Sequence, residues 1–228
     1  MLVSTLGFFG CLLRPFNPDN TYYLGRALAF GVLPIGGLKP FFIDSDKFDN
    51  IEGPAVIISN HQDNFDLFII GGIVPHNTVS MGKKIIRLFP FFGQAYWLSG
   101  QILIDRKRKK KAMGTMNQAA KQMKNKGMKV WIMPEGTRSR GKGLLPFRKG
   151  AFHLAVQTGF PIIPVVISSY AQQLNMNSLS YNPVVVKVYD PIKIEGELNE
   201  VNALKDHCEK VVREGLAEVD KMVLEKRK

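Results

Sequence analysis

Short apolar runs rich in β-branched residues alternate along the chain with segments of helical periodicity, and this alternation constrains the fold more than any other feature. Strands that alternate with helices in this way are typical of an α/β layered domain. We therefore expect a largely parallel or mixed sheet that is flanked by helices. The expected strands are Ala55–Ser59, Thr78–Met81, Ile102–Asp105, Lys129–Met133, Ile162–Ser168 and Val184–Tyr189, and the expected helices are Asp66–Ile73, Arg106–Lys126, Gly150–Gln157 and Val201–Glu225.

The overall charge of the chain favours a polyanionic partner. Lys and Arg number 31 against 19 Asp and Glu among 228 residues, so the formal net charge is +12. Such a balance suits nucleic acid, an anionic lipid surface or a phosphorylated substrate, and charge alone does not choose among them. Hydrophobic residues make up 45% of the chain, which predicts a folded protein with a substantial core. Its two cysteines, Cys11 and Cys208, form no CxxC motif, which favours a reducing compartment.

The N-terminal part of the chain contains two apolar stretches. Leu2–Leu13 carries no charge but is shorter than the about 20 residues that span a bilayer, and it lacks the flanking features of a signal peptide. Thr21–Ile43 is interrupted by Arg26 and by prolines and glycines, which is typical of interfacial or re-entrant helices. An ordinary buried helical hairpin is the alternative. We expect residues 1–45 to form an apolar helical membrane-associating segment and residues 46–228 to form the α/β domain.

A histidine and an aspartate follow the first expected strand, in the segment Asn-His-Gln-Asp-Asn-Phe-Asp at residues 60–66. A carboxylate about one helical turn after a histidine can reach one ring nitrogen and leave the other free to accept a proton. No Ser or Cys nucleophile accompanies the pair. We therefore expect His61 to act as a general base, oriented by Asp66, on a nucleophile that the substrate brings. The alternative is a turn histidine with satisfied hydrogen bonds, followed by an N-cap aspartate. Metal binding is not expected, because the other histidines (His76, His153 and His207) form no ligand cluster.

A second segment places a basic side chain at the end of an expected strand. Asp105 ends the expected strand Ile102–Asp105 and Arg106 follows it, and the planar guanidinium of Arg106 can hold a phosphate. An ion pair at the strand end is the alternative. The basic run that continues through Lys111 is either a solvated helix face or a contact for anionic headgroups.

A third segment, Pro-Glu-Gly-Thr-Arg-Ser-Arg-Gly at residues 134–141, directly follows a strand that we expect to be buried. Gly136 permits a tight turn, Thr137 and exposed backbone N–H groups can bind phosphate oxygens, and Arg138 adds a bidentate cation. Glu135 can order the arginine. A surface turn would explain the glycines and arginines, but it explains less well their order after a buried strand. We therefore expect an anion-binding turn.

These segments, taken in order, resemble the signature blocks of the glycerolipid acyltransferase family, and more narrowly those of the bacterial 1-acyl-sn-glycerol-3-phosphate acyltransferases. Asn-His-x4-Asp is similar to the catalytic block, Gly-x3-Ile-Asp-Arg at residues 100–106 to the second block, and residues 134–141 to the third. The run Phe160–Ile167 resembles the fourth, and we expect a core strand there, with Pro164 at an edge, a bulge or a strand start. One block would be weak evidence, whereas the ordered set is specific.

The resemblance implies acyl transfer from a thioester to the 2-hydroxyl of 1-acyl-sn-glycerol 3-phosphate, with His61 as the base and Asp66 as its orienting partner. The donor would be acyl-CoA or acyl carrier protein, and no cofactor is implied. Residues 46–228 would be the catalytic domain, on the cytoplasmic face of the inner membrane, with an anionic membrane surface as a partner. Lys83 or backbone N–H groups would face the developing oxyanion. The residues that the resemblance assigns to the glycerol-phosphate site are Arg106, Glu135, Gly136, Thr137 and Arg138, with Arg148 as a further candidate.

Other classes of function fit the sequence less well. A nucleic-acid-binding protein would use the positive charge, but the chain has no recognisable reading motif, and its aromatic residues do not lie among the basic ones. A hydrolase of phosphate esters or thioesters could use the same histidine and anion-binding turn, but the sequence has no metal-ligand cluster and no G-x-S-x-G elbow. Within the family, glycerol 3-phosphate or another lysophospholipid is an alternative acceptor.

Overall fold

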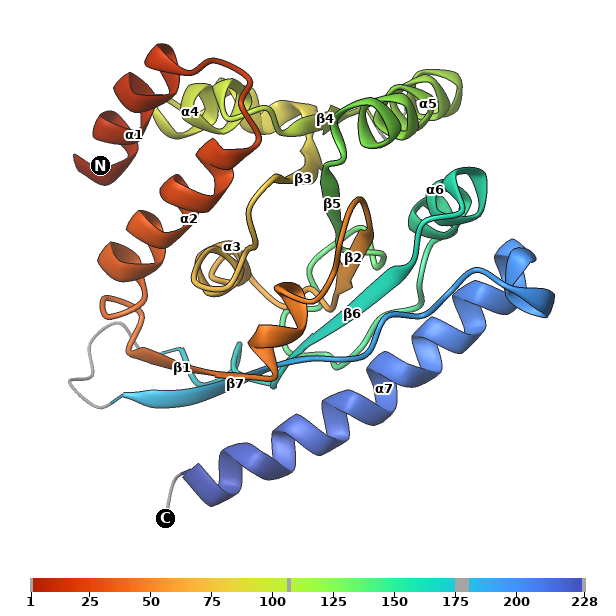
Figure 1. The fold of residues 1–228 in the computed structure, drawn as a ribbon. Coiled ribbons are helices and arrows are strands. Elements are labelled where there is room, and N and C mark those ends of the chain that lie inside the picture. The colour runs from red at the N-terminus through yellow and green to blue at the C-terminus, as the bar shows by residue number, and fades with distance from the viewer. Residues whose placement is uncertain (1, 106–107, 175–180, 227–228) are drawn as a thin grey trace.

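The alternating apolar runs assemble into one sheet with helices on both of its faces (Figure 1). The computed structural model describes residues 2–105, 108–174 and 181–226. Its strands are β1 (Leu38–Ile43), β2 (Val56–Ser59), β3 (Thr78–Lys83), β4 (Ile102–Ile104), β5 (Lys129–Ile132), β6 (Ile162–Ile167) and β7 (Asn182–Val188). Its α-helices are α1 (Leu2–Leu13), α2 (Asp19–Val32), α3 (Asp66–Gly71), α4 (Phe92–Leu98), α5 (Lys109–Lys126), α6 (Gly150–Thr158) and α7 (Val201–Lys226), and its 3-10 helices are η1 (Ser45–Phe48), η2 (Lys84–Leu88) and η3 (Gly196–Asn199).

The strands form a mixed sheet in the order β1-β7-β6-β2-β5-β3-β4. Neighbouring strands are parallel except β6 and β7, which are antiparallel. All the strands expected from the sequence are present near their predicted bounds, so the layered α/β fold with a mixed sheet is confirmed. Because β6, β2, β5, β3 and β4 run in one direction, their last residues lie along one edge of the sheet, which we call the carboxyl edge.

Strand β1 corrects the expectation for the N-terminal region. Helical character up to residue 45 is wrong for Leu38–Ile43, which pair in parallel with β7 along their whole length. Helix α2 ends at Val32, and Gly37 adopts a φ of 62°, a left-handed conformation that suits glycine. The Phe and Ile residues that follow favour a strand, and Pro40 is tolerated because β1 lies at the edge of the sheet. The division of the chain at residue 45 therefore falls just after a strand of the sheet.

Successive residues of the central strands point into two cores, one on each face of the sheet. In β2, Val56 and Ile58 belong to the core that includes residues of α5, α6 and α7, whereas Ile57 belongs to the core that includes residues of α2 and α3. Helix α7, which the sequence predicted over Val201–Glu225, buries one apolar stripe against the sheet, and the thiol of Cys208 lies within that stripe. Figure 1 shows α7 running along one side of the sheet.

Pro164 does not occupy any of the positions that we expected for a proline in a strand. It is in the interior of β6, which is a central strand between β7 and β2, and not at an edge, a bulge or a strand start. Its register partner on β2 is Ile58, and its carbonyl oxygen accepts a hydrogen bond from the backbone N–H of Tyr189 at 2.9 Å. Proline has no N–H to donate, so this position contributes its carbonyl oxygen alone to the ladder.

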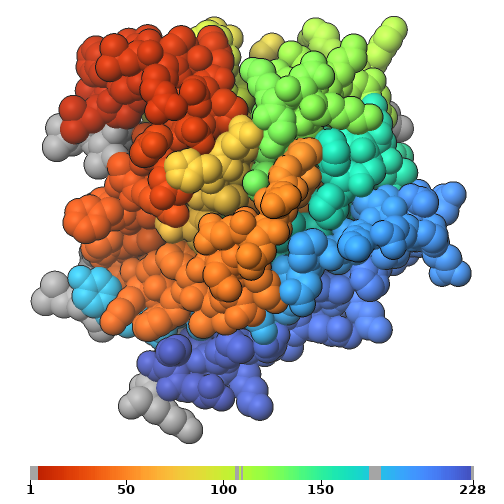
Figure 2. Space-filling model, viewed as in Figure 1, coloured from red at the N-terminus to blue at the C-terminus, as the bar shows by residue number. Residues whose placement is uncertain are grey.

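Helices α1 and α2 form a hairpin that is packed onto the body of the molecule. The backbone N–H of Phe16, in the turn between them, donates to the carbonyl oxygen of Leu98 at 2.7 Å. A Cβ atom on Gly71 would lie 2.5 Å from the carbonyl oxygen of Gly25, so glycine is what lets α2 approach α3 this closely. Arg26, which interrupts the second apolar stretch, donates to the carbonyl oxygen of Gly72 just after α3 at 2.8 Å. Figure 2 shows the N-terminal helices, in red and orange, lying directly against the rest of the molecule.

The hairpin also exposes apolar side chains to the outside. Phe30 on α2 is 88% exposed, and Leu6, Phe9 and Leu13 on α1 are exposed as well. The hairpin therefore packs against the body of the molecule with one face and exposes apolar side chains on another. It is less buried than the ordinary buried hairpin that was the alternative. Among the described residues, no helix combines the length and the apolar character needed to cross a membrane.

Candidate active site

His61 and Asp66 are joined by a short hydrogen bond where β2 gives way to α3. The distance from His61 Nδ1 to Asp66 Oδ2 is 2.6 Å. The Asp66 side chain is fully buried, whereas the His61 side chain is 23% exposed. Because an ionised carboxylate only accepts hydrogen bonds, Nδ1 carries the proton and Nε2 is left as the acceptor. This is the geometry required of an oriented general base.

Asp66 is held by more than the histidine. Its Oδ2 atom also accepts the backbone N–H groups of Gln62 at 2.6 Å and Asp63 at 3.0 Å. The residue at the N-cap of α3 is Phe65, and it makes no side-chain capping bond. The carboxylate therefore turns back onto the loop that carries His61, in place of serving as a simple helix cap.

Glu135 is a second buried carboxylate, and it ties the histidine loop to the third sequence segment. Its Oε1 atom accepts the backbone N–H of His61 at 2.6 Å, and its Oε2 atom accepts the backbone N–H of Leu145 at 2.9 Å. Burial raises the pKa of Glu135 to about 7. Both of its oxygens thus accept backbone N–H groups, so Glu135 positions the loops around the site. These contacts do not favour direct binding of a phosphate by Glu135.

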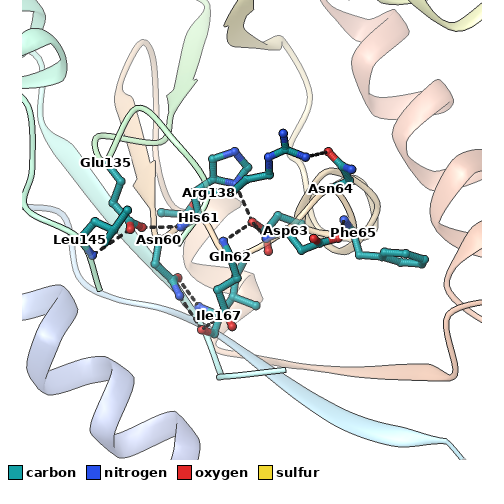
Figure 3. Close-up of polar contacts among 12 residues, drawn as sticks. Asn60, His61, Gln62, Asp63, Asn64, Phe65, Glu135, Arg138, Leu145 and Ile167 are labelled. Carbon is teal, nitrogen blue, oxygen red and sulfur yellow. Dashed lines mark hydrogen bonds and ion pairs between the residues drawn. The ribbon is translucent and has the colours of Figure 1, made fainter. Parts of the chain in front are cut away.

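The first and third sequence segments lie side by side, as the resemblance implies for a shared site. Backbone N–H groups of Ser139 and Arg140 donate to the carbonyl oxygens of His61 at 2.8 Å and Gln62 at 3.0 Å. Gly136 has a φ of 71°, which supplies the tight turn expected there. The Arg138 guanidinium donates to the side-chain oxygen of Asn64 at 2.6 Å, and it therefore lies beside the histidine loop (Figure 3).

The remaining candidate residues also lie toward the carboxyl edge, with one exception. Ser80, Trp131 and Ile57 form one row across β3, β5 and β2, and Lys83 lies beyond that row, as His61 does. Lys83, Thr137 and Arg148 have exposed side chains, and the backbone N–H of Arg148 donates to the carbonyl oxygen of Pro134 at 2.9 Å. The exception is Arg106, which falls outside the described residues.

Sequence reasoning missed the residues that lock the histidine loop to the end of β6. The Asn60 side chain both donates to the carbonyl oxygen of Ile167 and accepts its N–H, each at 2.8 Å. The Gln62 side chain donates to the carbonyl oxygens of Ile167 at 3.1 Å and Ser168 at 2.8 Å. Tyr170, which follows β6, donates its hydroxyl to Asp66. Because Asn60 and Gln62 flank the histidine in the sequence, their position could have indicated a role in the site. No sequence pattern indicated a role for Tyr170.

A polar cavity of about 200 Å³ adjoins these contacts and is lined by Gln62, Glu135, Ser139 and Tyr170, among others. Within the described part of the chain, the Ser139 hydroxyl is buried and has no hydrogen-bond partner. The size and polar lining of the cavity suit ordered water, which would satisfy that hydroxyl. The described residues contain no group of His, Cys, Asp and Glu side chains that could hold a metal ion.

The buried carboxyl of Glu135 makes the stability of the protein depend on pH. Its pKa of about 7 in the folded state lies above the ordinary 4.5, so the folded protein binds the proton more tightly than the unfolded chain. This contribution to stability is present at low pH and is lost as the pH rises from about 4.5 to about 7. We expect the difference in unfolding free energy between the wild type and Glu135→Gln to fall across this range, as measured by chemical denaturation.

Glu214→Gln is the matched control, because Glu214 is an exposed carboxylate on α7. Its difference from the wild type should stay nearly constant over the same pH range. A constant difference for Glu135→Gln as well would contradict the assignment of the buried, proton-binding carboxyl.

Comparisons with known proteins find both similar sequences and a similar fold. The family model described as Acyltransferase matches residues 41–168. The chain is 41% identical to the 1-acyl-sn-glycerol-3-phosphate acyltransferase of Escherichia coli K12, over 99% of this chain and 92% of that protein. It is 39% identical to the protein of the same name from Haemophilus influenzae, over 98% of this chain and 92% of the relative. The solved structure of the 1-acyl-sn-glycerophosphate (LPA) acyltransferase PlsC from Thermotoga maritima shares the fold, with a TM-score of 0.71 at 23% identity and with 95% of each chain covered.

Proposed function

The chain belongs to the acyltransferase family, and we propose that it transfers a fatty acyl group from a thioester to the 2-hydroxyl of 1-acyl-sn-glycerol 3-phosphate, which gives phosphatidate for phospholipid synthesis. The observation that carries this proposal is the pairing of His61 with the fully buried Asp66 in the absence of a Ser or Cys nucleophile in the segment. The relatives named for this reaction cover nearly the whole chain.

In the proposed reaction, the Nε2 atom of His61 takes the proton of the acceptor hydroxyl. The oxygen of that hydroxyl then attacks the thioester carbonyl, and the carbon–sulfur bond breaks as the new ester bond forms. The leaving thiolate recovers a proton from the His61 imidazolium, which Asp66 stabilises meanwhile. No acyl-enzyme forms, because the substrate supplies the nucleophile. General-base assistance of this kind contributes roughly 10²–10⁴-fold, so alignment and oxyanion stabilisation must supply the remainder.

The acceptor's phosphate is held by the basic turn beside the histidine loop. Arg138 supplies a bidentate guanidinium that Asn64 already orients, and Gly136 and Thr137 supply backbone and hydroxyl donors. Arg106 and Arg148 are further cationic contacts, and Lys83 faces the oxyanion from the end of β3. Glu135 acts in this site by holding the backbone of His61.

Incubation of the purified protein with an acyl thioester tests the function directly. Transfer to lysophosphatidate requires the acceptor, whereas a thioesterase would release free acid without it. We expect product only when the acceptor is present, and we expect His61→Ala to abolish it because the base is lost. His153→Ala, at an exposed histidine on α6, is the matched control and should keep wild-type activity.

Near-normal transfer by a folded His61→Ala protein would contradict the assignment of His61 as the base.

Asp66→Asn should lower the rate of acyl transfer by orders of magnitude, because an amide favours the wrong imidazole tautomer. A panel of acceptors and of both donors, read by product mass, separates lysophosphatidate from glycerol 3-phosphate and other lysolipids, and acyl-CoA from acyl carrier protein.

The phosphate assignment predicts a defect in substrate binding for Arg138→Ala. Loss of the guanidinium should mainly raise the KM for lysophosphatidate, by about tenfold or more, since a charge-assisted hydrogen bond is lost. Steady-state kinetics with varied lysophosphatidate measures this. Arg213→Ala, on α7, is the control, and an unchanged KM and rate in Arg138→Ala would exclude Arg138 from the phosphate site.

Because the acceptor and the product are membrane lipids, we place the enzyme on the inner membrane, with its catalytic domain on the cytoplasmic face. A surface formed by the exposed apolar residues of α1, α2 and η2 supports this placement. In η2, Leu88 is 71% exposed, and Lys84 and Arg87 lie in the same short helix. The Arg87 guanidinium lies 4.1 Å above the Trp97 ring, which in turn contacts Phe16 edge-on, so η2 is linked to the N-terminal hairpin. Apolar and cationic groups together are what attachment to an anionic bilayer requires.

Substitution at the end of η2, at Leu88 and the residue that follows it, should weaken this attachment. We expect Leu88→Ser with Phe89→Ser to reduce partition onto vesicles that contain anionic lipid by about tenfold or more, because two exposed apolar side chains are lost. High salt should weaken binding of the wild type without abolishing it. Leu224→Ser on α7, where Leu224 is 59% exposed, is the matched control. Equal partition of the η2 variant, the control variant and the wild type would contradict the proposed surface.

A further inference from the structure

Tyr170 reaches the catalytic pair from a part of the chain that none of the sequence segments includes. It lies three residues after the end of β6 at Ile167, and its side chain is buried. Its hydroxyl donates a hydrogen bond to Asp66 Oδ1. The other carboxylate oxygen, Oδ2, takes His61 and the two backbone N–H groups of the loop. The two oxygens of Asp66 are therefore held by two segments that are distant in the sequence, the loop after β2 and the segment after β6.

The position of Tyr170 is fixed by the same loop that carries the base. Its backbone N–H donates to the side-chain oxygen of Gln62 at 3.1 Å. The amide nitrogen of Gln62 binds the carbonyl oxygens of Ile167 and Ser168, and Asn60 pairs with Ile167 through both of its polar atoms. The end of β6 thus cannot shift relative to His61 without breaking several buried hydrogen bonds.

The environment of Tyr170 keeps it a hydrogen-bond donor. Burial and the nearby negative charge of Asp66 raise the pKa of the Tyr170 hydroxyl far above its ordinary value. The hydroxyl therefore stays protonated at any pH at which the enzyme works. A neutral hydroxyl that faces a buried carboxylate can only donate to it, so the direction of the hydrogen bond is set.

We propose that Tyr170 is a positioning residue for acyl transfer, acting through Asp66 to fix the orientation and the proton affinity of the His61 imidazole. The inference rests on the proposed function. Without the hydroxyl, Oδ1 loses a charge-assisted donor, and the carboxylate is free to rotate away from Nδ1. The unshared negative charge also favours the protonated imidazole more strongly, so His61 stays unavailable as a base up to a higher pH.

The test is Tyr170→Phe, which keeps the ring and removes the hydroxyl. We expect kcat to fall about 10- to 100-fold, since a buried hydrogen bond to a charged group is lost. The KM for lysophosphatidate should stay near the wild-type value, because the Tyr170 side chain is buried and its hydroxyl is bonded to Asp66. The acidic limb of the pH–rate profile should move to higher pH. A role in folding alone would lower thermal stability but would leave that limb in place.

Tyr189→Phe is the matched control. The Tyr189 hydroxyl also donates to a carboxylate, Glu218, at 2.6 Å, but between β7 and α7, away from the histidine. It should leave kcat and the pH profile unchanged. Wild-type kcat and an unmoved acidic limb in Tyr170→Phe would overturn the inference.

A second variant tests the role of Tyr170 if Tyr170→Phe does not fold. A fluorinated tyrosine at position 170 retains the hydroxyl and makes it a stronger donor, so the acidic limb should move to lower pH. An unmoved limb would overturn the inference in the same way. Both outcomes require an active wild type, whereas a wild type without acceptor-dependent transfer would refute the proposed function and the inference with it.

Discussion

A single buried carboxylate organises the functional end of this molecule. Asp66 is fully buried, and removing an ion from water costs several kcal/mol unless the protein replaces its hydrogen bonds. Here the replacement comes from the imidazole of His61, two backbone N–H groups and the Tyr170 hydroxyl. These donors come from the loop after β2 and from the segment after β6. The need to satisfy one charge therefore brings separate parts of the sheet edge into a fixed geometry around the histidine.

Glu135 complements this arrangement from the other side of the histidine. It grips the backbone of His61 and of Leu145, so it links the loop after β2 to the long loop that ends at α6. One carboxylate thus fixes the ring of His61 and another fixes its backbone. Because both the ring and the backbone of His61 are fixed, its Nε2 atom has a defined position beside the Arg138 turn. Such preorganisation is what direct attack by a substrate hydroxyl demands, because no covalent intermediate holds the reactants together.

The sequence predicted what depends on local pattern. The apolar runs of β2, β5 and β6, the helix α7 and the closeness of the His61 and Arg138 segments follow from periodicity and from the convergence of parallel strands at one edge. Strand β1 was missed because its apolar residues continue those of α2, and nothing local reveals its pairing with β7. The part played by Tyr170 was not predictable for a similar reason. Its hydroxyl and the Asp66 carboxylate are 104 residues apart in the chain, and the pairing of β2 with β6 brings them together.

The central claim is that an oriented imidazole activates the acceptor's own hydroxyl, so that the acyl group passes directly from thioester to lipid. Intact-protein mass measured after incubation with a labelled acyl thioester, first without and then with lysophosphatidate, tests this claim most directly. The account predicts an unmodified protein at every time point, with label that appears only in phosphatidate. A stoichiometric acyl-protein adduct that forms without the acceptor and is discharged when the acceptor is added would contradict it.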